Sequence, residues 1–245
     1  MEEGPIWIRE LWHWVSPQFT IPTELLSSWL VMVILLVIGG LAGCRATLRP
    51  GKLQNVFEMA LEYVRELSLK IAGPEGPRFL PLFATLFMFI LIGNWSGLIP
   101  GFMSPTANLN INAGMALIVM VSTEFLNVKH KGPVGYFKHL CGPPYWLAPL
   151  FFLIRAMEIF TRPLSLTMRL FGNMVAKEII LAVLVYLITL FFFAHGVVYK
   201  LLLIVPLLLR PGIVILGALV GFVQAMVFTA LAMFYIGTAF EQHHH

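Results

Sequence analysis

The chain has 245 residues, of which 59% are hydrophobic and only 11% are charged. A soluble domain usually carries about 25% charged residues, so a soluble fold of this length could not cover so much apolar side chain. The net charge of +4 does not indicate a nucleic-acid partner, because the basic residues stand in short connections beside apolar runs. The composition therefore predicts an integral membrane protein whose surface is mostly covered by lipid.

Five apolar stretches are long enough to cross a bilayer as helices, since one span needs about 20 such residues. They follow a segment of mixed character over 1–26, in which no cleavable signal peptide is expected. The predicted spans cover 27–44, 79–98, 109–126, 145–193 and 200–240. The last two exceed a perpendicular span, so long, tilted or kinked helices are expected there. We expect one all-α transmembrane domain over 1–245, without internal repeats.

The stretch 51–73 differs in kind from the spans. Its apolar residues recur at helical spacing, and its charged residues fill the other side, among them Glu58, Glu62, Arg65, Glu66 and Lys70. This pattern predicts an amphipathic helix that is too charged to span and that lies flat in the membrane interface. Packing against a soluble partner is the alternative.

The charge of the connections predicts the orientation. The connections 45–78 and 127–144 are basic, whereas 99–108 has no charged residue and 194–200 has only Lys200. Because cytoplasmic loops carry the excess of Lys and Arg, the N-terminus is expected outside and the C-terminus in the cytoplasm. The amphipathic helix is then expected on the cytoplasmic face.

Arg169 stands inside an apolar run, where an ionisable group costs several kcal/mol and is a functional candidate. Arg155 and Arg162 lie near the cytoplasmic end of the same span, so they can reach the headgroups by snorkelling. Arg169 is about 10 Å farther along the helix, which places it near mid-membrane. A guanidinium remains charged there, so Arg169 needs a carboxylate partner or a water-lined cavity.

Two glutamates bracket Arg169 along the helix axis. Glu158 is about 16 Å nearer the cytoplasm and Glu178 about 13 Å nearer the outside. Two carboxylates on opposite sides of a fixed cation indicate two separate aqueous approaches. A structural salt bridge from Arg169 to either glutamate is the alternative, and Glu158 could instead pair with Arg162 at i+4.

Two residues with side-chain amides stand in the last two predicted spans, and one of them lies near Arg169. Asn173 is four residues after Arg169 and shares its helix face. Gln224 sits in the middle of the last span, where a lone amide usually forms a hydrogen bond between helices.

The run RPLSLTMRLFGNM at 162–174 resembles the signature of subunit a of bacterial-type F-type ATP synthases. Three further segments agree with this resemblance. Residues 94–101 resemble the end of the family's second span, 105–110 resemble the start of its third, and 224–235 resemble its final helix. The resemblance covers nearly the whole chain in the right order.

The resemblance implies a stator subunit of the membrane (Fo) sector, in which two tilted helices over 145–240 lie against a rotating ring of c subunits. Ion flow through two offset half-channels would turn the ring and drive ATP synthesis in a bacterial plasma (inner) membrane. It also implies b-type peripheral stalk partners, no catalysis by this chain itself, and no cofactor or metal.

The resemblance also implies roles for single residues. Arg169 matches the essential arginine that faces the ring carboxylate. Glu178 and Asn173 match residues of the external half-channel, Gln224 matches the glutamine of the facing helix, and Glu158 matches a carboxylate of the cytoplasmic half-channel.

The chain departs from the family pattern at two positions. Lys177 stands where the family more often has glycine, which puts a second cation beside Glu178. Gly217 stands where some bacterial relatives carry a histidine that partners this glutamate. Proton handling at the outer channel is therefore expected to rely on Glu178 and water.

A stand-alone secondary ion transporter is the alternative function from another class. Such transporters usually show two related halves, and this sequence shows none. A haem-binding respiratory subunit would need paired histidines within spans, but only His195 lies near one. The sequence leaves open whether the translocated ion is a proton or sodium.

Overall fold

The computed structural model describes residues 23–44, 51–99, 102–141, 147–194 and 196–241. Within these ranges the chain forms six α-helices, two short 3-10 helices and no strand. The α-helices are α2 (Thr23–Cys44), α3 (Lys52–Ala72), α4 (Leu80–Ser96), α5 (Leu109–Cys141), α6 (Ala148–Phe193) and α7 (Val197–Glu241). The 3-10 helices are η1 (Gly76–Phe79) and η2 (Pro105–Ala107). Among the described residues, five segments are long and apolar enough to cross a membrane, which confirms the predicted all-α membrane class.

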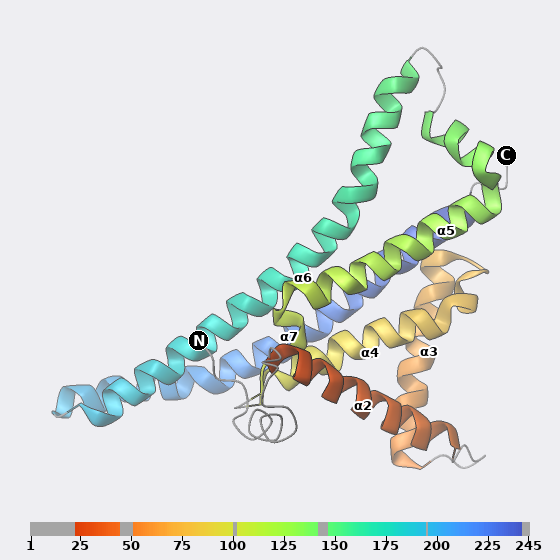
Figure 1. Ribbon diagram of the computed structural model, residues 1–245. Helices are drawn as coiled ribbons and strands as arrows, with labels where there is room; N and C mark the ends of the chain where they lie inside the picture. Colours follow the sequence, from red (N-terminus) through yellow and green to blue (C-terminus); the bar gives the residue numbers. More distant parts are fainter. Residues whose placement is uncertain (1–22, 45–50, 100–101, 142–146, 195, 242–245) are drawn as a thin grey trace, which may run out of the picture.

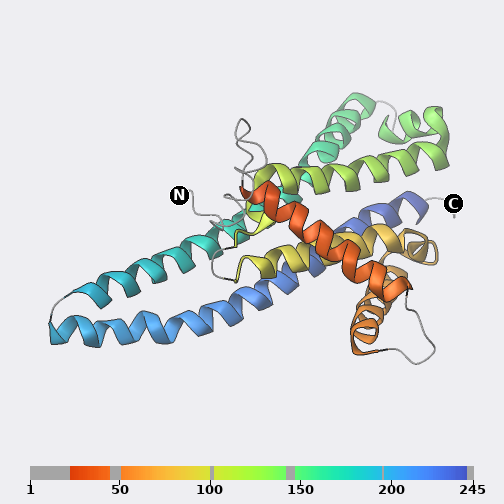
Figure 2. The same cartoon turned by 60° about the horizontal axis from the view of Figure 1, so that its bottom comes forward.

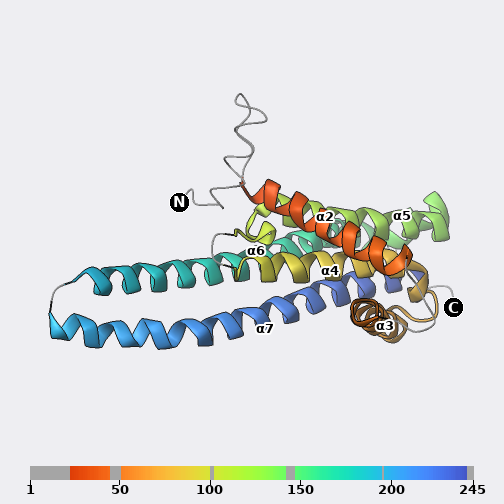
Figure 3. The same ribbon diagram turned by 90° about the horizontal axis from the view of Figure 1, so that it is seen from below.

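Helices α6 and α7 dominate the shape of the molecule. They contain 46 and 45 residues, and at 1.5 Å per residue each is nearly 70 Å long, about twice the hydrocarbon thickness. They run antiparallel and side by side, and their joined ends project well beyond the other helices (Figures 1 and 3). The prediction of two long, tilted final spans is confirmed. Pro163 lies inside α6, and Figure 1 shows that helix bent along its course.

The core of the bundle lies where α4 packs against α7. Because side chains of both helices interlock there, several large residues are almost fully covered, including Phe83, Ile90, Phe228, Met233 and Ile236. Leu166 and Leu170 of α6 join the same cluster. Elsewhere the long helices expose apolar side chains, such as Leu208 at 72%, as expected of a surface covered by lipid or partner subunits.

Helix α3 has three faces. Val64, Ser68 and Ala72 are buried where α3 packs against α7 and α4. A second strip exposes Val56, Met59 and Tyr63, and the remaining side carries the charged residues. Figure 3 shows α3 end-on, crossing the direction of the other helices. The predicted amphipathic helix is confirmed, and its position in the membrane interface remains a prediction that the exposed apolar strip supports.

Helix α5 differs from its predicted end at residue 126. The helix continues to Gly132, where φ is 70° and ψ is 160°, and a further helical segment runs back to Cys141 (Figure 2). The Gly, Pro and Lys content of 127–144 suggested a loop, but only Gly132 breaks the helix, because glycine tolerates a positive φ. A hydrogen bond of 2.7 Å from the phenol of Tyr136 to Glu124 spans this reversal.

The predicted external segment 1–26 falls mostly outside the described residues. Its last four residues, 23–26, already belong to α2, so the first helix begins earlier than predicted. Glu24 stands in the first turn of this helix.

We predict that Gly237→Ala destabilises the chain by roughly 1–3 kcal/mol, the usual range for overpacking. A Cβ at Gly237 would lie 2.9 Å from the backbone Cα of Ala72, so α3 would have to move away from α7. Thermal unfolding in detergent measures the effect. Gly212→Ala in the same helix is the matched control, since a Cβ there meets nothing within 4 Å; equal melting temperatures for the two variants would contradict the close crossing.

Candidate functional site

Arg169 lies on the open face of α6. Its side chain is exposed, whereas Leu166 and Leu170 beside it are buried in the core. Of the ion pairs found among the described residues, none involves Arg169. Because α6 is an apolar span, this cation needs a counter-charge or water, and no carboxylate of the described residues forms an ion pair with it.

The two glutamates that bracket Arg169 have partners of their own. Glu158 accepts a hydrogen bond of 3.1 Å from the guanidinium of Arg162, the i+4 pairing that was one of the two predicted possibilities. Glu178 accepts one of 3.3 Å from the backbone N–H of Ser104. Since α6 is one helix from 148 to 193, both carboxylates stay more than about 10 Å from Arg169 along the axis. The alternative of a salt bridge from Arg169 to either glutamate is therefore wrong.

Asn173 and Gln224 join α6 to α7 next to Arg169. The amide of Asn173 donates a hydrogen bond of 2.9 Å to Oε1 of Gln224. Gln224 is buried and Asn173 is exposed, so the pair reaches from the helix contact to the open face. The structure thus confirms that the mid-span glutamine bonds between helices, and it places this contact one turn from Arg169.

A buried polar network surrounds the other side of Glu178. The hydroxyl of Ser104 donates a hydrogen bond of 2.8 Å to the carbonyl oxygen of Gly93. It also lies 2.7 Å from the hydroxyl of Thr106. The hydroxyl of Thr106 in turn donates a hydrogen bond of 2.6 Å to Oδ1 of Asn94. The side-chain amide of Asn94 completes the network by donating a hydrogen bond of 3.0 Å to the carbonyl oxygen of Gly221. Because these three side chains have no exposed surface, the network fixes η2, α4 and α7 around the carboxylate on α6.

Sequence reasoning missed these polar residues as part of the site. They stand at the ends of two spans and in the uncharged connection between them: Asn94, Ser104, Thr106 and Asn112. The side-chain amide of Asn112 donates a hydrogen bond of 2.7 Å to the carbonyl oxygen of Thr106. Their segments were recognised only through the resemblance. The available signal was a connection rich in hydroxyl and amide groups but without charge, which is suited to burial because most such groups can be paired inside the protein.

Lys177 is buried between helices. Only 6% of this residue is exposed, and its ammonium donates a hydrogen bond of 2.9 Å to the backbone carbonyl oxygen of Asn94. Lys177 and Glu178 form no ion pair within 4.0 Å. The lysine stem passes over Gly217, where an added Cβ would lie 3.3 Å from Lys177 Cδ and 3.0 Å from a methyl group of Leu98. Lys177 and Gly217 are therefore parts of one packing arrangement.

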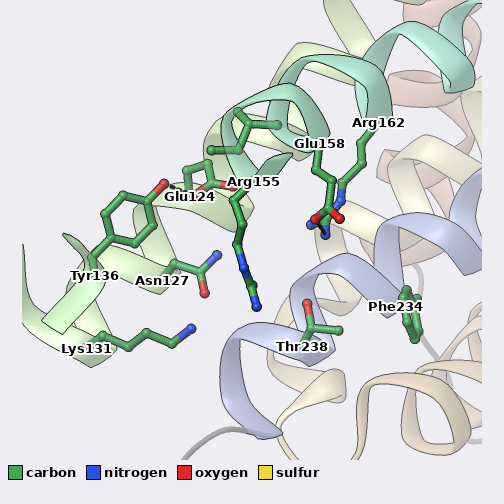
Figure 4. Close-up of a pocket in the computed structure, with 10 residues that line it drawn as sticks. Glu124, Asn127, Lys131, Tyr136, Arg155, Glu158, Arg162, Phe234 and Thr238 are labelled. Carbon is green, nitrogen blue, oxygen red and sulfur yellow. Dashed lines mark hydrogen bonds and ion pairs between the residues drawn. The ribbon is translucent and has the colours of Figure 1, made fainter. Parts of the chain in front are cut away.

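A cavity of about 230 Å³ opens at the basic end of the bundle, where α5 ends, α6 begins and α7 ends. Figure 4 shows the side chains of Arg155, Lys131 and Thr238 directed into it. Arg162 and Glu158 lie on one of its sides (Figure 4), and the guanidinium of Arg162 also stacks 5.2 Å from the centre of the Tyr235 ring. These contacts of Arg162 lie within the protein, and snorkelling to the headgroups stays a prediction.

Tyr136 holds the other side of this cavity. Burial and the hydrogen bond to Glu124 raise the pKa of Tyr136 to about 12, since both favour the neutral phenol. The phenol therefore remains a donor to Glu124 at any physiological pH. The result is a polar cavity at the basic end, with Glu158 about 16 Å from Arg169 along α6, and a separate buried network around Glu178 on the far side.

Comparison with known proteins agrees with this arrangement. Residues 25–237 match the family described as ATP synthase A chain. The chain is 43% identical over 217 residues to a protein of Syntrophotalea carbinolica named ATP synthase subunit a 2, covering 89% of this chain and 85% of the relative. It is 40% identical to ATP synthase subunit a of Geotalea daltonii, covering 89% and 87%.

A third relative extends the match towards the ends of the chain. ATP synthase subunit a of Citrifermentans bemidjiense is 38% identical over 236 residues, which is 96% of this chain and 95% of the relative. The spans, the exposed arginine of α6 and the length of the match lead to one conclusion: the chain belongs to the ATP synthase A chain family.

Proposed function

We propose that this chain is the ion-translocating stator subunit of a rotary F-type ATP synthase, and that it carries protons through two half-channels against a ring of c subunits. The observation that supports this most directly is Arg169, a cation on the open face of an apolar helix without an ion-pair partner in the described chain. A carboxylate on a neighbouring subunit would supply the missing charge.

Arg169 would set the protonation of that carboxylate. A ring carboxylate must be neutral while it faces lipid, because burial disfavours the charged form. Beside the guanidinium the ionised form is favoured, so the proton leaves there. The fixed positive charge would also repel a proton that tried to pass directly between the two approaches. One proton can then enter and another can leave only if the ring steps.

The two approaches would lie on opposite sides of Arg169. The cavity beside Glu158 would form the cytoplasmic one, because it opens at the end where Lys131 and Arg155 gather and positive residues favour the cytoplasm. The outer one would run past Glu178 and Asn173, with Gln224 facing them from α7. Each charge that crosses the membrane field is worth about 2.3 kcal/mol per 100 mV, so several protons are needed for each ATP.

The same proposal assigns the surroundings of the chain. Its N-terminus lies outside and its C-terminus in the cytoplasm of a bacterial plasma membrane, with b-type peripheral stalk subunits and lipid against its remaining faces. It makes no ATP itself, since its sequence has no G-x-x-x-x-G-K-[ST] phosphate loop. The ion is a proton unless the surroundings of the ring carboxylate select sodium.

Lys177 belongs to the outer approach in this proposal. Its stem fills the space over Gly217, and its ammonium lies against α4 on the carbonyl of Asn94. A histidine at 217 and a lysine at 177 would compete for one volume. Glu178 therefore works without a histidine partner as long as Lys177 is present.

We predict that Arg169→Ala abolishes ATP-driven acidification of inverted membrane vesicles at normal levels of assembled complex. The side chain is exposed and holds no ion pair in the described chain, so its loss should not unfold the helices. Arg169→Lys should fail as well, because a compact ammonium does not reproduce the planar guanidinium. Arg210→Ala, in α7 and away from the site, is the control that should keep pumping. Normal pumping by Arg169→Ala would remove Arg169 from the ion path and leave it a structural residue.

We predict that Glu178→Gln slows ATP-driven pumping several-fold while assembly is unchanged. The glutamine can still accept the hydrogen bond from Ser104, so the variant removes the titratable group and keeps the local geometry. Glu62→Gln on α3, whose pair with Arg65 at 3.4 Å is largely exposed, is the matched control. Equal rates for the two variants would make Glu178 a bystander.

We predict that Gly217→His impairs assembly of the complex and that Lys177→Gly in the same chain restores it. The histidine needs the volume that the lysine stem occupies, so the two changes should be coupled by about 0.5–3 kcal/mol, the range for residues in contact. The thermal stability of the four members of this cycle measures the coupling. The same cycle with Gly212→His should show none, and additive effects at Gly217 would argue against the shared volume.

A further inference from the structure

A groove of about 440 Å³ lies on the basic end of the bundle, separate from the cavity beside Glu158. It is formed by the end of η1, by one face of α5, and by the end of α7. The side chains that line it are Arg78, Phe79, Ser122, Phe125, Leu126, Lys129, His130 and Phe240. None of these belongs to the proposed ion path.

The α5 face of the groove changes from apolar to basic along the helix. Its five residues, from Ser122 to His130, are spaced three and four apart, so they form one stripe. Phe125 and Leu126 lie nearer the middle of the span, and Lys129 and His130 lie about one turn nearer its end. A molecule that fits this stripe has an apolar part directed into the membrane and a polar part at its surface.

Aromatic rings make up much of the apolar wall. The Phe79 and Phe240 rings lie 5.8 Å apart and the His130 and Phe240 rings 4.8 Å apart, which closes the side of the groove toward the protein. Phe125 is 64% exposed and leaves the other side open to the membrane. Acyl chains can therefore enter the groove from the bilayer.

The charge of the groove is positive. Arg78 and Lys129 are both exposed, and of the described residues that line the groove none carries a carboxylate. The nearest ion pair, from Arg78 to Glu75 at 3.7 Å, joins side chains that are 73% and 52% exposed, so water weakens it. A transmembrane helix of another subunit would fit this end only if it brought acidic groups.

We propose that the groove binds an anionic phospholipid of the leaflet on the basic side. Its phosphate contacts Arg78 and Lys129, with the imidazole of His130 beside it, and one acyl chain lies along Phe125 and Leu126. Basic pockets between transmembrane helices bind anionic headgroups in this way. This site is separate from the proposed ion path, because none of its lining residues belongs to that path. Its occupancy can be measured without a pumping assay.

The test uses the assembled complex in nanodiscs with a phosphatidylglycerol probe that carries a photoactivatable acyl chain. We predict labelling of peptides that contain 122–130 and 78–79, with competition by unlabelled phosphatidylglycerol and little by phosphatidylcholine. Lys129→Gln and Arg78→Gln should each weaken the apparent affinity about fivefold, since one basic residue near anionic lipid contributes about 1 kcal/mol.

Lys70→Gln is the matched control, because Lys70 is an exposed lysine of α3 outside the groove and the change of charge is the same. Three outcomes would overturn the proposal. Equal labelling by a phosphatidylcholine probe would remove the charge selectivity, and competition by inorganic phosphate as strong as that by the lipid would leave only an ion site. A photoreactive residue in place of Phe125 that captures another subunit instead of lipid would identify a protein interface.

Discussion

The cost of a permanent charge in hydrocarbon is the constraint on which the rest of this structure depends. A guanidinium in the middle of a span costs several kcal/mol unless a counter-charge or water reaches it. The chain places Arg169 on the open face of α6 and gives both nearby glutamates other partners, Arg162 and the backbone of Ser104. The arginine is thus left without an ion pair in the described chain, as the proposed ion path between two subunits requires.

The polar groups near Glu178 show how the bundle accommodates such a site. In a bilayer, buried polar atoms cannot rely on water, so they must be satisfied by one another. Asn94, Ser104 and Thr106 do this across three elements. Lys177 adds its ammonium to the same network through the carbonyl of Asn94. Glu178 therefore contacts this hydrogen-bonded network through Ser104, while Asn173 and Arg169 remain on the open face of α6.

Much of this could be predicted from the sequence, because helix periods and apolar runs report directly on burial in lipid. The five spans, the amphipathic helix and an interhelical hydrogen bond of Gln224 follow from such local patterns, but its partner Asn173 does not. The end of α5 could not be predicted, since a polar helix beyond the membrane has the composition of a loop and only Gly132 marks its reversal. The Ser104 network and the packing of Lys177 over Gly217 join residues 40 or more positions apart in most of their contacts, and no local pattern records them.

The unequal support of α6 has a mechanical consequence. Its part around Arg169 is anchored from behind by Leu170 and Met174, which are fully covered, whereas the joined ends of α6 and α7 project beyond the bundle with only each other for support (Figures 1 and 3). The pair resembles a cantilever fixed at one end. A sideways thrust at Arg169 acts close to the fixed end, where the lever arm is short and deflection is small. The arginine can therefore keep its position under load even while the far tip of the hairpin yields to the surrounding membrane.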